Sequence, residues 1–477
     1  MTEGHVPLRT KMAYGVGAIA YGIKDNGYST FLLLFYNQVV GLPAGIVSSV
    51  IALALIFDAM IDPVIGSLSD RTHSRWGRRH PWLYASALPI ALTWMMLWFP
   101  PATSQAGVLG WLLLAAVLTR AAIATNEVPS LAMAPEMTAD YHERTLVLRY
   151  RYLFGWAGGL GMLFLAYGVF LAPPLGALTG PGALTGFQLY GIFGAVVMGV
   201  TVLISAIGTH RRMAHPPTKR VQTYGLGETL RAARETLSNR AFLILMASGI
   251  LAYTNQGIGF AISNYNLNFV WQFSSPQLLI YAAALFLGVV LTFLLVSPIG
   301  HALGKKRALA LLTILHALFV TSTYILRLID MFPEPGSPAL LPTFLTINTL
   351  GVSFGVGAMI LGASMMSDVV EDSEERTGRR EEGLFFAGAL FMQKCAGGLG
   401  ILLTGWILSL AEFPAKAVKG SVPLEVLDRY TMIFVVITLV VAALSALISL
   451  RFPFGQAEHE ARLAKLAVAA AESGGKS

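Results

Sequence analysis

Charged residues are scarce in this sequence. Only 12% of its 477 residues are Asp, Glu, Lys or Arg, whereas 55% are hydrophobic, and the mean hydropathy is +0.64. A soluble domain usually carries about 25% charged residues. The composition therefore excludes an ordinary soluble protein and predicts a membrane protein.

Cysteine and the motifs of common enzymes are also scarce. The single Cys395 lies within an apolar run, so the chain can form neither a disulfide framework nor a Cys-rich metal site. The nine histidines form no H-E-x-x-H pattern, and no nucleophile and base stand out together. The N-terminus lacks a charged region, a short apolar core and a cleavage site, so we expect no cleaved signal peptide. We do not expect an enzyme or a cofactor.

Long apolar runs dominate the chain. A transmembrane helix needs about 20 apolar residues, and the runs that meet this length predict twelve spans, at 12–39, 44–68, 81–100, 107–136, 149–172, 186–209, 241–271, 277–300, 307–328, 342–368, 384–411 and 429–451. The predicted fold is an all-α membrane protein.

Basic residues mark every second loop. They gather at 71–79, 144–151, 211–240, 305–307 and 376–380, whereas the alternate loops are nearly bare. Excess Lys and Arg lie on the cytoplasmic side, so both termini are predicted to be cytoplasmic, in a multi-pass protein of a bacterial inner membrane. The net charge of +7 is spread over these loops, which argues against nucleic-acid binding.

The longest polar stretch divides the chain into two halves. We predict an N-terminal six-helix half at 1–210, a cytoplasmic middle loop at 211–240, a C-terminal six-helix half at 241–452 and a cytoplasmic tail at 453–477. "GSLSDRTHSRWGRRHPW" after the second span and "SPIGHALGKKRALALL" after the eighth form a weak internal repeat. Such repeats are common in transporters with a central site.

Two aspartates lie in the middle of the second span. Asp58 and Asp62 are four residues apart, so on a helix both carboxylates project from one face. An ionisable group at this depth costs several kcal/mol unless it has a partner or faces a cavity. The pair could bind a coupling cation, or it could be a structural pair satisfied by an Arg.

Further polar residues interrupt the other spans. Arg120 and Glu127 lie seven residues apart in the fourth span and could line a cavity or form a staple between helices. Lys394 lies in an apolar helix beside several glycines and could reach the two aspartates. The polar residues that we assign to substrate binding also include Asp25, Asn126, Asn264 and Tyr265, which could instead form hydrogen bonds between helices.

A charged segment follows the tenth span. "MMSDVVEDSEERTGRREEG" carries acidic and then basic residues, and we interpret it as part of a cytoplasmic gate; a solvated loop is the alternative. The residues that we assign to the gate are Asp70, Arg78, Arg79, Asp368, Asp372 and Arg379.

Several of these motifs resemble the glycoside-pentoside-hexuronide:cation symporters of the major facilitator superfamily. "FDAMIDPVIGSLSDRTHSRWGRRHPW" is similar to the second helix and following loop of that family. "NEVPSLAMAPEMTADYHERT", "DVVEDSEERTGRREEG" and "FMQKCAGGLG" are similar to its fourth-helix and tenth-to-eleventh-helix segments. The resemblance, in order over essentially the whole chain, implies the major facilitator fold.

The resemblance also implies roles for single residues. Asp58 and Asp62 match the carboxylates that bind the coupling cation, and Lys394 matches a lysine near that site. Glu127 stands where a fourth-helix carboxylate contacts sugar, and Arg151 matches a fifth-helix arginine of the substrate site.

Four positions depart from the family pattern. Gly22 stands where the first helix has a sugar-binding aspartate, and Leu131 replaces an aromatic that recognises the sugar. Ile61 and Ala124 replace neutral oxygen ligands of the cation site. Sodium needs several oxygen ligands, whereas a proton needs one carboxylate of suitable affinity, so we favour H⁺ over Na⁺.

We therefore predict a monomeric secondary active transporter in contact with membrane lipid, which carries a small molecule. The favoured substrate is a sugar or glycoside. Lysolipid transporters share the D-x-x-x-D-P motif, so with Leu131 in place of the aromatic, a lysolipid is the alternative substrate. A passive channel or a sensor is a weaker alternative.

Overall fold

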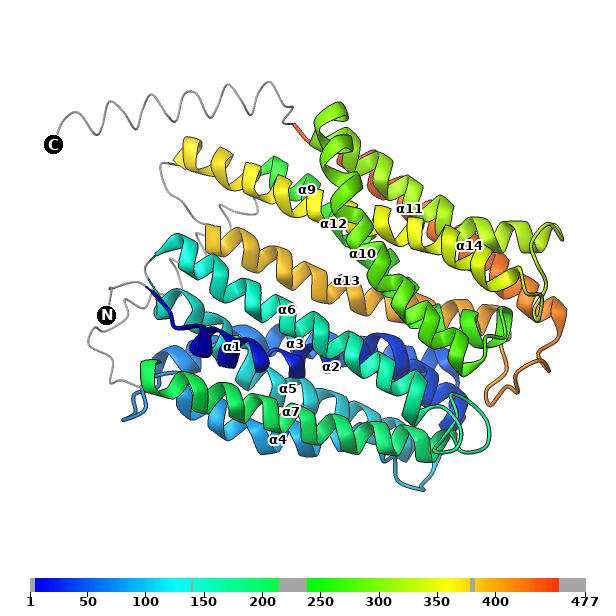
Figure 1. Ribbon diagram of the computed structural model, residues 1–477, viewed down its shortest axis with the longest axis horizontal. Helices are drawn as coiled ribbons and strands as arrows, with labels where there is room; N and C mark the ends of the chain where they lie inside the picture. Colours follow the sequence, from blue (N-terminus) through cyan, green and yellow to red (C-terminus); the bar gives the residue numbers. More distant parts are fainter. Residues whose placement is uncertain (1–4, 139, 214–237, 378–381, 454–477) are drawn as a thin grey trace. The chain divides into compact units, whose positions relative to one another are not determined.

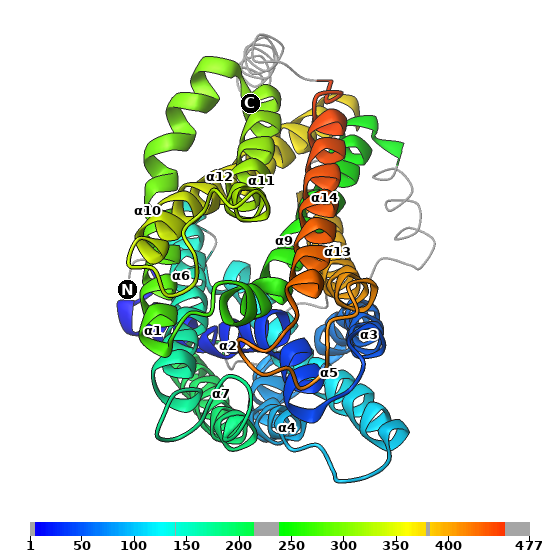
Figure 2. The ribbon, with the colours of Figure 1, turned by 90° about the vertical axis from the view of Figure 1, so that its right-hand side faces the viewer.

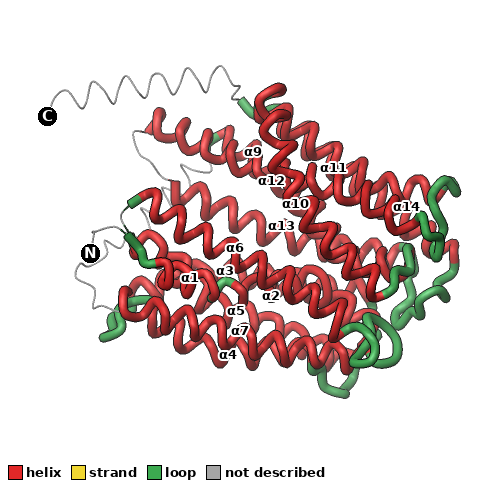
Figure 3. Tube along the Cα trace, in the orientation of Figure 1, coloured by secondary structure: helices red, strands yellow, loops and turns green. Residues whose placement is uncertain are grey.

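The computed structural model describes residues 5–138, 140–213, 238–377 and 382–453, and every regular element in these ranges is a helix (Figure 3). The chain divides into two compact units. Unit 1 comprises Met1–Gln222, Gly259–Ala282 and Ile401–Leu427; unit 2 comprises Thr223–Ile258, Ala283–Gly400 and Asp428–Ser477. Most of the predicted middle loop (214–237) and of the predicted tail (454–477) lies outside the described residues.

The first predicted span is a helical run with changing pitch. It consists of α1 (Leu8–Val16), α2 (Ile19–Asn26) and the π-helices η1 (Gly27–Leu32) and η2 (Phe35–Val40). The run ends at Gly41, whose φ of 98° lies in the left-handed region that glycine adopts readily. π-helical turns are rare and often occur at functional sites.

The remaining helices follow in chain order (Figure 1). Those of the N-terminal half are α3 (Ala44–Arg71), α4 (His80–Trp98), α5 (Gln105–Met137), α6 (Tyr141–Leu165) with η3 (Ala166–Phe170), and α7 (Ala183–Met213). Those of the C-terminal half are α9 (Arg240–Tyr265) with η4 (Asn266–Val270), α10 (Ser275–Leu303), α11 (Lys305–Leu328), α12 (Leu340–Thr377), α13 (Glu382–Leu410) and α14 (Leu424–Ser449).

Ten of these helical segments are long and apolar enough to cross a membrane, which confirms a multi-pass membrane protein. They coincide with ten of the predicted spans. The other two predicted spans, 12–39 and 81–100, coincide with the interrupted first run and with α4. Side-chain caps begin three of the helices: Ser104 accepts a hydrogen bond from the Gly107 amide, Asp140 accepts one from the Glu143 amide, and Asn239 accepts one from the Phe242 amide.

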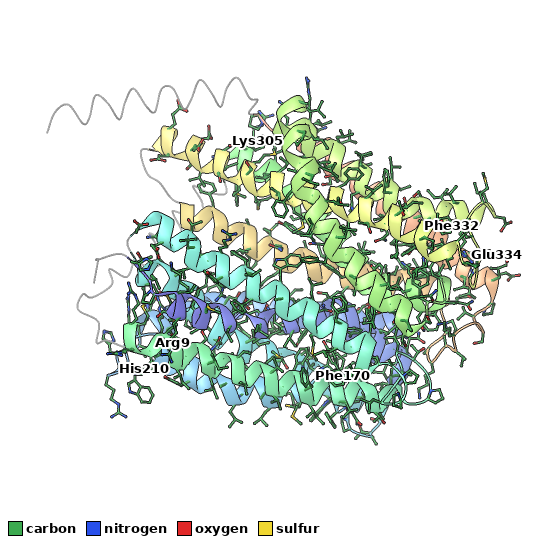
Figure 4. All side chains as sticks on the ribbon, viewed as in Figure 1. Arg9, Phe170, His210, Lys305, Phe332 and Glu334 are labelled. Atoms are coloured by element: carbon green, nitrogen blue, oxygen red, sulfur yellow. The ribbon has the colours of Figure 1, made fainter. Side chains whose placement is uncertain are left out.

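Unit 1 is built around tightly packed helix pairs. Helix α4 lies beside α5 and α7, α3 packs on α5, and α2 packs on α6 (Figure 2). Trp98 stacks on Phe187 with ring centroids 5.6 Å apart, and Phe35 and Tyr190 complete this aromatic core. Arg9 and His210 lie at one end of unit 1, and Phe170 lies near the other end (Figure 4).

The two C-terminal segments of unit 1 are bonded to its N-terminal helices. The Tyr265 hydroxyl donates to Asn37 Oδ1 at 3.0 Å. The Gln38 amide donates to the Pro414 carbonyl and accepts from the Ala417 amide. Buried amide and hydroxyl groups at this end therefore find partners in neighbouring segments, as burial requires.

Unit 2 contains the remaining parts of the C-terminal half. Helix α11 packs on α12. Ser248 of α9 and Ser445 of α14 each donate to the carbonyl of the other. A Cβ added to Gly400 would lie 2.6 Å from Gly257 Cα, so α9 and α13 approach at the level of their backbones.

The contact between α2 and α6 also depends on glycine. A Cβ on Gly22 would overlap the carbonyl oxygen of Gly155 and would lie 2.7 Å from the backbone nitrogen of Gly159. An aspartate at position 22 would therefore separate the two helices. The observed contact therefore leaves no room at position 22 for the aspartate that the family resemblance implies there.

We predict that Gly22→Ala lowers the thermal unfolding temperature of the detergent-solubilised protein. Overpacking a close contact typically costs about 1–3 kcal/mol. The matched control is Gly161→Ala in α6, where an added Cβ meets no atom within 4 Å; it should leave the unfolding temperature unchanged or slightly raised. Equal unfolding temperatures for Gly22→Ala and the unmodified protein would contradict this description of the contact.

Candidate functional site

Four helices of unit 1 bring ionisable side chains into its interior. Helix α5 supplies Arg120 and Glu127 from one face, because seven residues correspond to about two helical turns. Asp58 comes from α3, Lys24 from α2 and Arg151 from α6. All but Glu127 are classed as buried, so the charges need partners within the protein.

Asp58 forms an ion pair with Arg120. The Arg120 Nη1 donates to Asp58 Oδ2 at 3.2 Å, and the two side chains are only 7% and 4% exposed. The guanidinium carbon lies 4.3 Å from the centroid of the Tyr28 ring, a cation–π contact from η1. This pair corresponds to the alternative in which an arginine satisfies the aspartate.

Lys24 bridges two other carboxylates. Its Nζ lies 3.1 Å from Glu127 Oε2 and 3.0 Å from Asp25 Oδ1. The Lys24 side chain is 3% exposed, whereas the Asp25 side chain is 64% exposed. Glu127 thus pairs with Lys24, and Arg120 pairs with Asp58. These ion pairs differ from the alternative of an Arg120–Glu127 staple.

Arg151 is held by hydroxyl groups and aromatic rings. Its Nη1 donates to Ser130 Oγ at 2.8 Å, and its guanidinium lies 4.7 Å from the Tyr21 ring centroid and 5.7 Å from that of Tyr14. The Tyr14 hydroxyl donates to the Ser130 carbonyl. Hydroxyl oxygens and aromatic faces thus fix the orientation of this planar guanidinium.

Asn126 connects three helices. Its side-chain oxygen accepts from the Tyr21 hydroxyl at 2.5 Å, and its amide donates to Ser86 Oγ at 2.8 Å. In the structure its described partners are therefore protein groups on α2 and α4. Its predicted contact with substrate stays a prediction.

Asp62 is half-buried one turn beyond Asp58 on α3. The next residue, Pro63, has no N–H and cannot donate to the carbonyl of Ala59. A proline at this point therefore leaves a carbonyl oxygen without its usual intrahelical donor, between the two aspartates in sequence. Carboxylate and carbonyl oxygens are ligands that hard cations prefer.

Three of the departures from the family pattern lie near this cluster in sequence. Ala124 is buried, Ile61 is half-buried, and Leu131 is exposed, as lipid-facing or cavity-lining residues would be. Among the described residues, no group of three or more His, Cys, Asp or Glu side chains could hold a metal ion.

The predicted gate residues of unit 1 form one cluster at the end that carries His210. Arg79 Nη2 lies 2.5 Å from Asp70 Oδ1 and 3.0 Å from Glu136 Oε1, and Arg78 Nη2 lies 3.2 Å from the same Glu136 oxygen. Arg79 also donates to Ser69 Oγ. The cluster ties the loop after α3 to the C-terminal end of α5.

The predicted gate residues of unit 2 have other partners. Asp368 Oδ1 pairs with Lys305 Nζ at 2.6 Å, and Lys305 is labelled in Figure 4. Asp372 accepts from the Asn239 side-chain amide at 3.2 Å. Arg379 lies outside the described residues, and the opening and closing of these contacts stays a prediction.

The remaining predicted site residues lie elsewhere. Lys394 is half-buried in α13 and belongs to unit 2, and its pairing with the aspartates of α3 stays a prediction. Asn264 is buried in unit 1, where it accepts from the Tyr167 hydroxyl and donates to the Thr30 carbonyl. Asn264 and Tyr265 thus form the interhelical hydrogen bonds that were the alternative to substrate contact.

Sequence reasoning missed several partners in these clusters. Glu136 was not assigned to the gate, although it lies in the last turn of the helix that carries Glu127. Lys24 was not assigned to the site either, yet it pairs with both Glu127 and Asp25. An intramembrane lysine is itself a functional signal and could have identified it. The aromatic partner Tyr28 has no such signal in the sequence.

Comparisons with known proteins agree with the family resemblance. Residues 13–456 match the family of MFS/sugar transport proteins. The inner membrane symporter YicJ of Escherichia coli is 26% identical over 93% of this chain and 91% of its own length. The putative glycoside/cation symporter YagG of E. coli is 26% identical over 91% and 90%. The isoprimeverose transporter of Lactiplantibacillus pentosus is 24% identical over 93% and 88%.

Solved structures show the same fold. A bacterial homologue of the lysosomal transporter Spinster matches with a TM-score of 0.65 at 16% identity, covering 93% of this chain and 96% of its own. The nucleoside transporter NupG matches with a TM-score of 0.61 at 15% identity, covering 94% and 98%. The family consists of membrane transporters, which confirms the prediction of a transporter rather than an enzyme. The chain therefore belongs to the MFS/sugar transport proteins, the glycoside-pentoside-hexuronide:cation symporters that its motifs resemble.

Proposed function

We propose that this protein is a cation-coupled symporter that imports a sugar or glycoside across a bacterial inner membrane. The observation that carries the proposal is the cluster of charged side chains inside unit 1, with Asp58, Arg120 and Lys24 almost completely buried. Such charges are costly in a membrane and mark substrate and ion pathways. The printed names of the relatives, which include a glycoside/cation symporter and an isoprimeverose transporter, support this class of substrate.

The proposed topology has twelve spans in two six-helix halves, with both termini in the cytoplasm and the protein acting as a monomer. Ten apolar helices, the interrupted first run and α4 supply the twelve segments. Transport would follow from alternating exposure of a site between the halves.

In the proposed mechanism, H⁺ is the coupling ion and Asp58, Asp62 and Lys394 form the coupling site. Substrate would contact Glu127, Arg151, Asn126 and Arg120, with Asp25, Asn264 and Tyr265 at its margin. A bound ion can drive the exchange of states only through unequal affinity for them. Lys24 holds Glu127 at 3.1 Å, so a hydroxyl-rich ligand could compete for this carboxylate.

The second candidate substrate is a lysolipid. Leu131 is exposed. It stands at the position where the family pattern has an aromatic residue that recognises the sugar. An apolar side chain favours an acyl chain over the face of a pyranose. Binding measured against glycosides, pentosides, uronic acids and lysolipids would distinguish the two substrate classes.

We predict that Asp58→Asn and Asp62→Asn each abolish gradient-driven accumulation of substrate in vesicles. Amides can neither accept nor release a proton, so substrate flux would lose its link to the gradient. Exchange of labelled for unlabelled substrate needs no net ion movement and can survive in both variants. The measurement is uptake of a labelled substrate identified in the binding panel.

The matched control is Asp330→Asn, an exposed aspartate in the turn after α11 that belongs to neither the proposed coupling site nor the proposed substrate site. It should retain accumulation. Undiminished accumulation in both Asp58→Asn and Asp62→Asn would refute the coupling role. Absence of labelled counterflow in the unmodified protein would instead favour a channel or a sensor.

We also predict that uptake depends on pH and not on sodium. Ile61 and Ala124 cannot supply side-chain oxygens, so a sodium ion would lack two of the oxygen ligands that the family pattern supplies. Initial uptake rates should rise with an inward proton gradient and stay constant when sodium replaces choline at fixed pH and membrane potential. A strong decrease of the half-saturation concentration on adding sodium would contradict the choice of the proton.

A further inference from the structure

The ion pair of Asp58 and Arg120 has a consequence for the choice of coupling ion. A carboxylate this deeply buried requires a positive charge nearby, and the guanidinium supplies it at 3.2 Å. Arg120 is part of the protein, so its positive charge lies next to Asp58 at any concentration of dissolved cations. A mobile cation would have to displace it to reach Asp58.

Arg120 is held on a second side by an aromatic face. The Tyr28 ring lies 4.3 Å from the guanidinium carbon, and the Tyr28 hydroxyl is anchored to the Ala116 carbonyl at 2.9 Å. Tyr28 is itself buried within η1. The ring therefore fixes the guanidinium plane against α3 and favours the paired position.

The remaining donors of Arg120 are little used. One of its five N–H donors bonds to Asp58, and within the described part of the chain its buried Nε has no hydrogen-bond partner. A purely structural arginine would more often use several donors in a bidentate or networked arrangement. Its contact with Asp58 is a single charge-assisted hydrogen bond, which is how a cation neutralises a carboxylate.

The described ion pairs and contacts of the two other buried cations of this cluster involve other groups. Lys24 contacts Glu127 and Asp25, and Arg151 contacts Ser130 and two tyrosine rings. Arg120 is thus the cation that the ion pairs assign to Asp58. Asp62, one turn further along α3, is not part of this ion pair.

We propose that Arg120 is a built-in counter-ion that occupies the place of a mobile cation at Asp58. Sodium is thereby excluded from this carboxylate. This inference rests on the proposed cation-coupled transport, of which it specifies the ion. It gives Arg120 a role in ion specificity in addition to its proposed contact with substrate.

The test measures the unfolding temperature of the purified full-length protein without substrate. Sodium is varied against choline at fixed pH and ionic strength. The unmodified protein should show no sodium-specific shift of its unfolding temperature. Arg120→Gln removes the counter-ion and should gain a saturable shift. At a sodium concentration of about ten times the dissociation constant, the unfolding equilibrium should move about tenfold.

Three further variants locate the effect. Adding Asp58→Asn to Arg120→Gln should abolish the gained response, and Arg120→Lys, which keeps a positive charge, should show none. Arg151→Gln removes another buried cation of unit 1 that is not paired with Asp58, and it should show none either. A folded Arg120→Gln protein without a sodium response, or an equal response in Arg151→Gln, would overturn the proposal.

If Arg120→Gln fails to fold, direct binding of radioactive sodium to the unmodified protein tests whether sodium reaches Asp58. Saturable binding to the unmodified protein that Asp58→Asn abolishes would overturn the proposal, and its absence would support it. Counterflow without accumulation would refute cation coupling, whereas sodium binding at Asp58 would refute only the role of Arg120.

Discussion

The arrangement of unit 1 depends on one constraint, the cost of placing charges inside a membrane protein. Asp58, Lys24, Arg120 and Arg151 are all buried, and each lies against an opposite charge, a hydroxyl group or an aromatic ring. Breaking a buried pair by removing one partner typically costs about 3–5 kcal/mol. The helices that carry these side chains must therefore keep their positions relative to one another. Because each pair contributes this much, an ion or ligand that replaces one partner can change the relative stability of the transporter's states.

Backbone features hold the charges where they are needed. Gly22, Gly155 and Gly159 let α2 approach α6 closely, so that Lys24 of α2 enters the interior next to Glu127 of α5. The π-helical turn η1 places Tyr28 under Arg120. Pro63 follows Asp62 directly and removes an intrahelical donor on α3. These features do not bind a ligand themselves, yet they determine which side chains face one another.

Much of this could be predicted from the sequence, because membrane helices follow simple composition rules. Apolar runs located the helix ends within about five residues, except that α6 begins eight residues before and α12 ends nine residues after the predicted span, where the helices continue through polar residues. The motif around Asp58 and Asp62 indicated the family. Pairing could not be predicted in the same way. Arg120 and Glu127 share a face of α5, which suggested one pair, but their partners come from α3 and α2, and only tertiary packing selects them. The role of Glu136 likewise depends on a loop that folds back onto α5.

The central claim is that carboxylates of α3 carry an ion together with the substrate. Proton movement measured with a pH-sensitive dye trapped in proteoliposomes tests it most directly, at zero membrane potential and with a substrate found by binding. The account predicts acidification of the vesicle interior that accompanies substrate entry, is unchanged by sodium and is lost in the Asp62→Asn protein. Substrate entry against its gradient without any proton movement would contradict it.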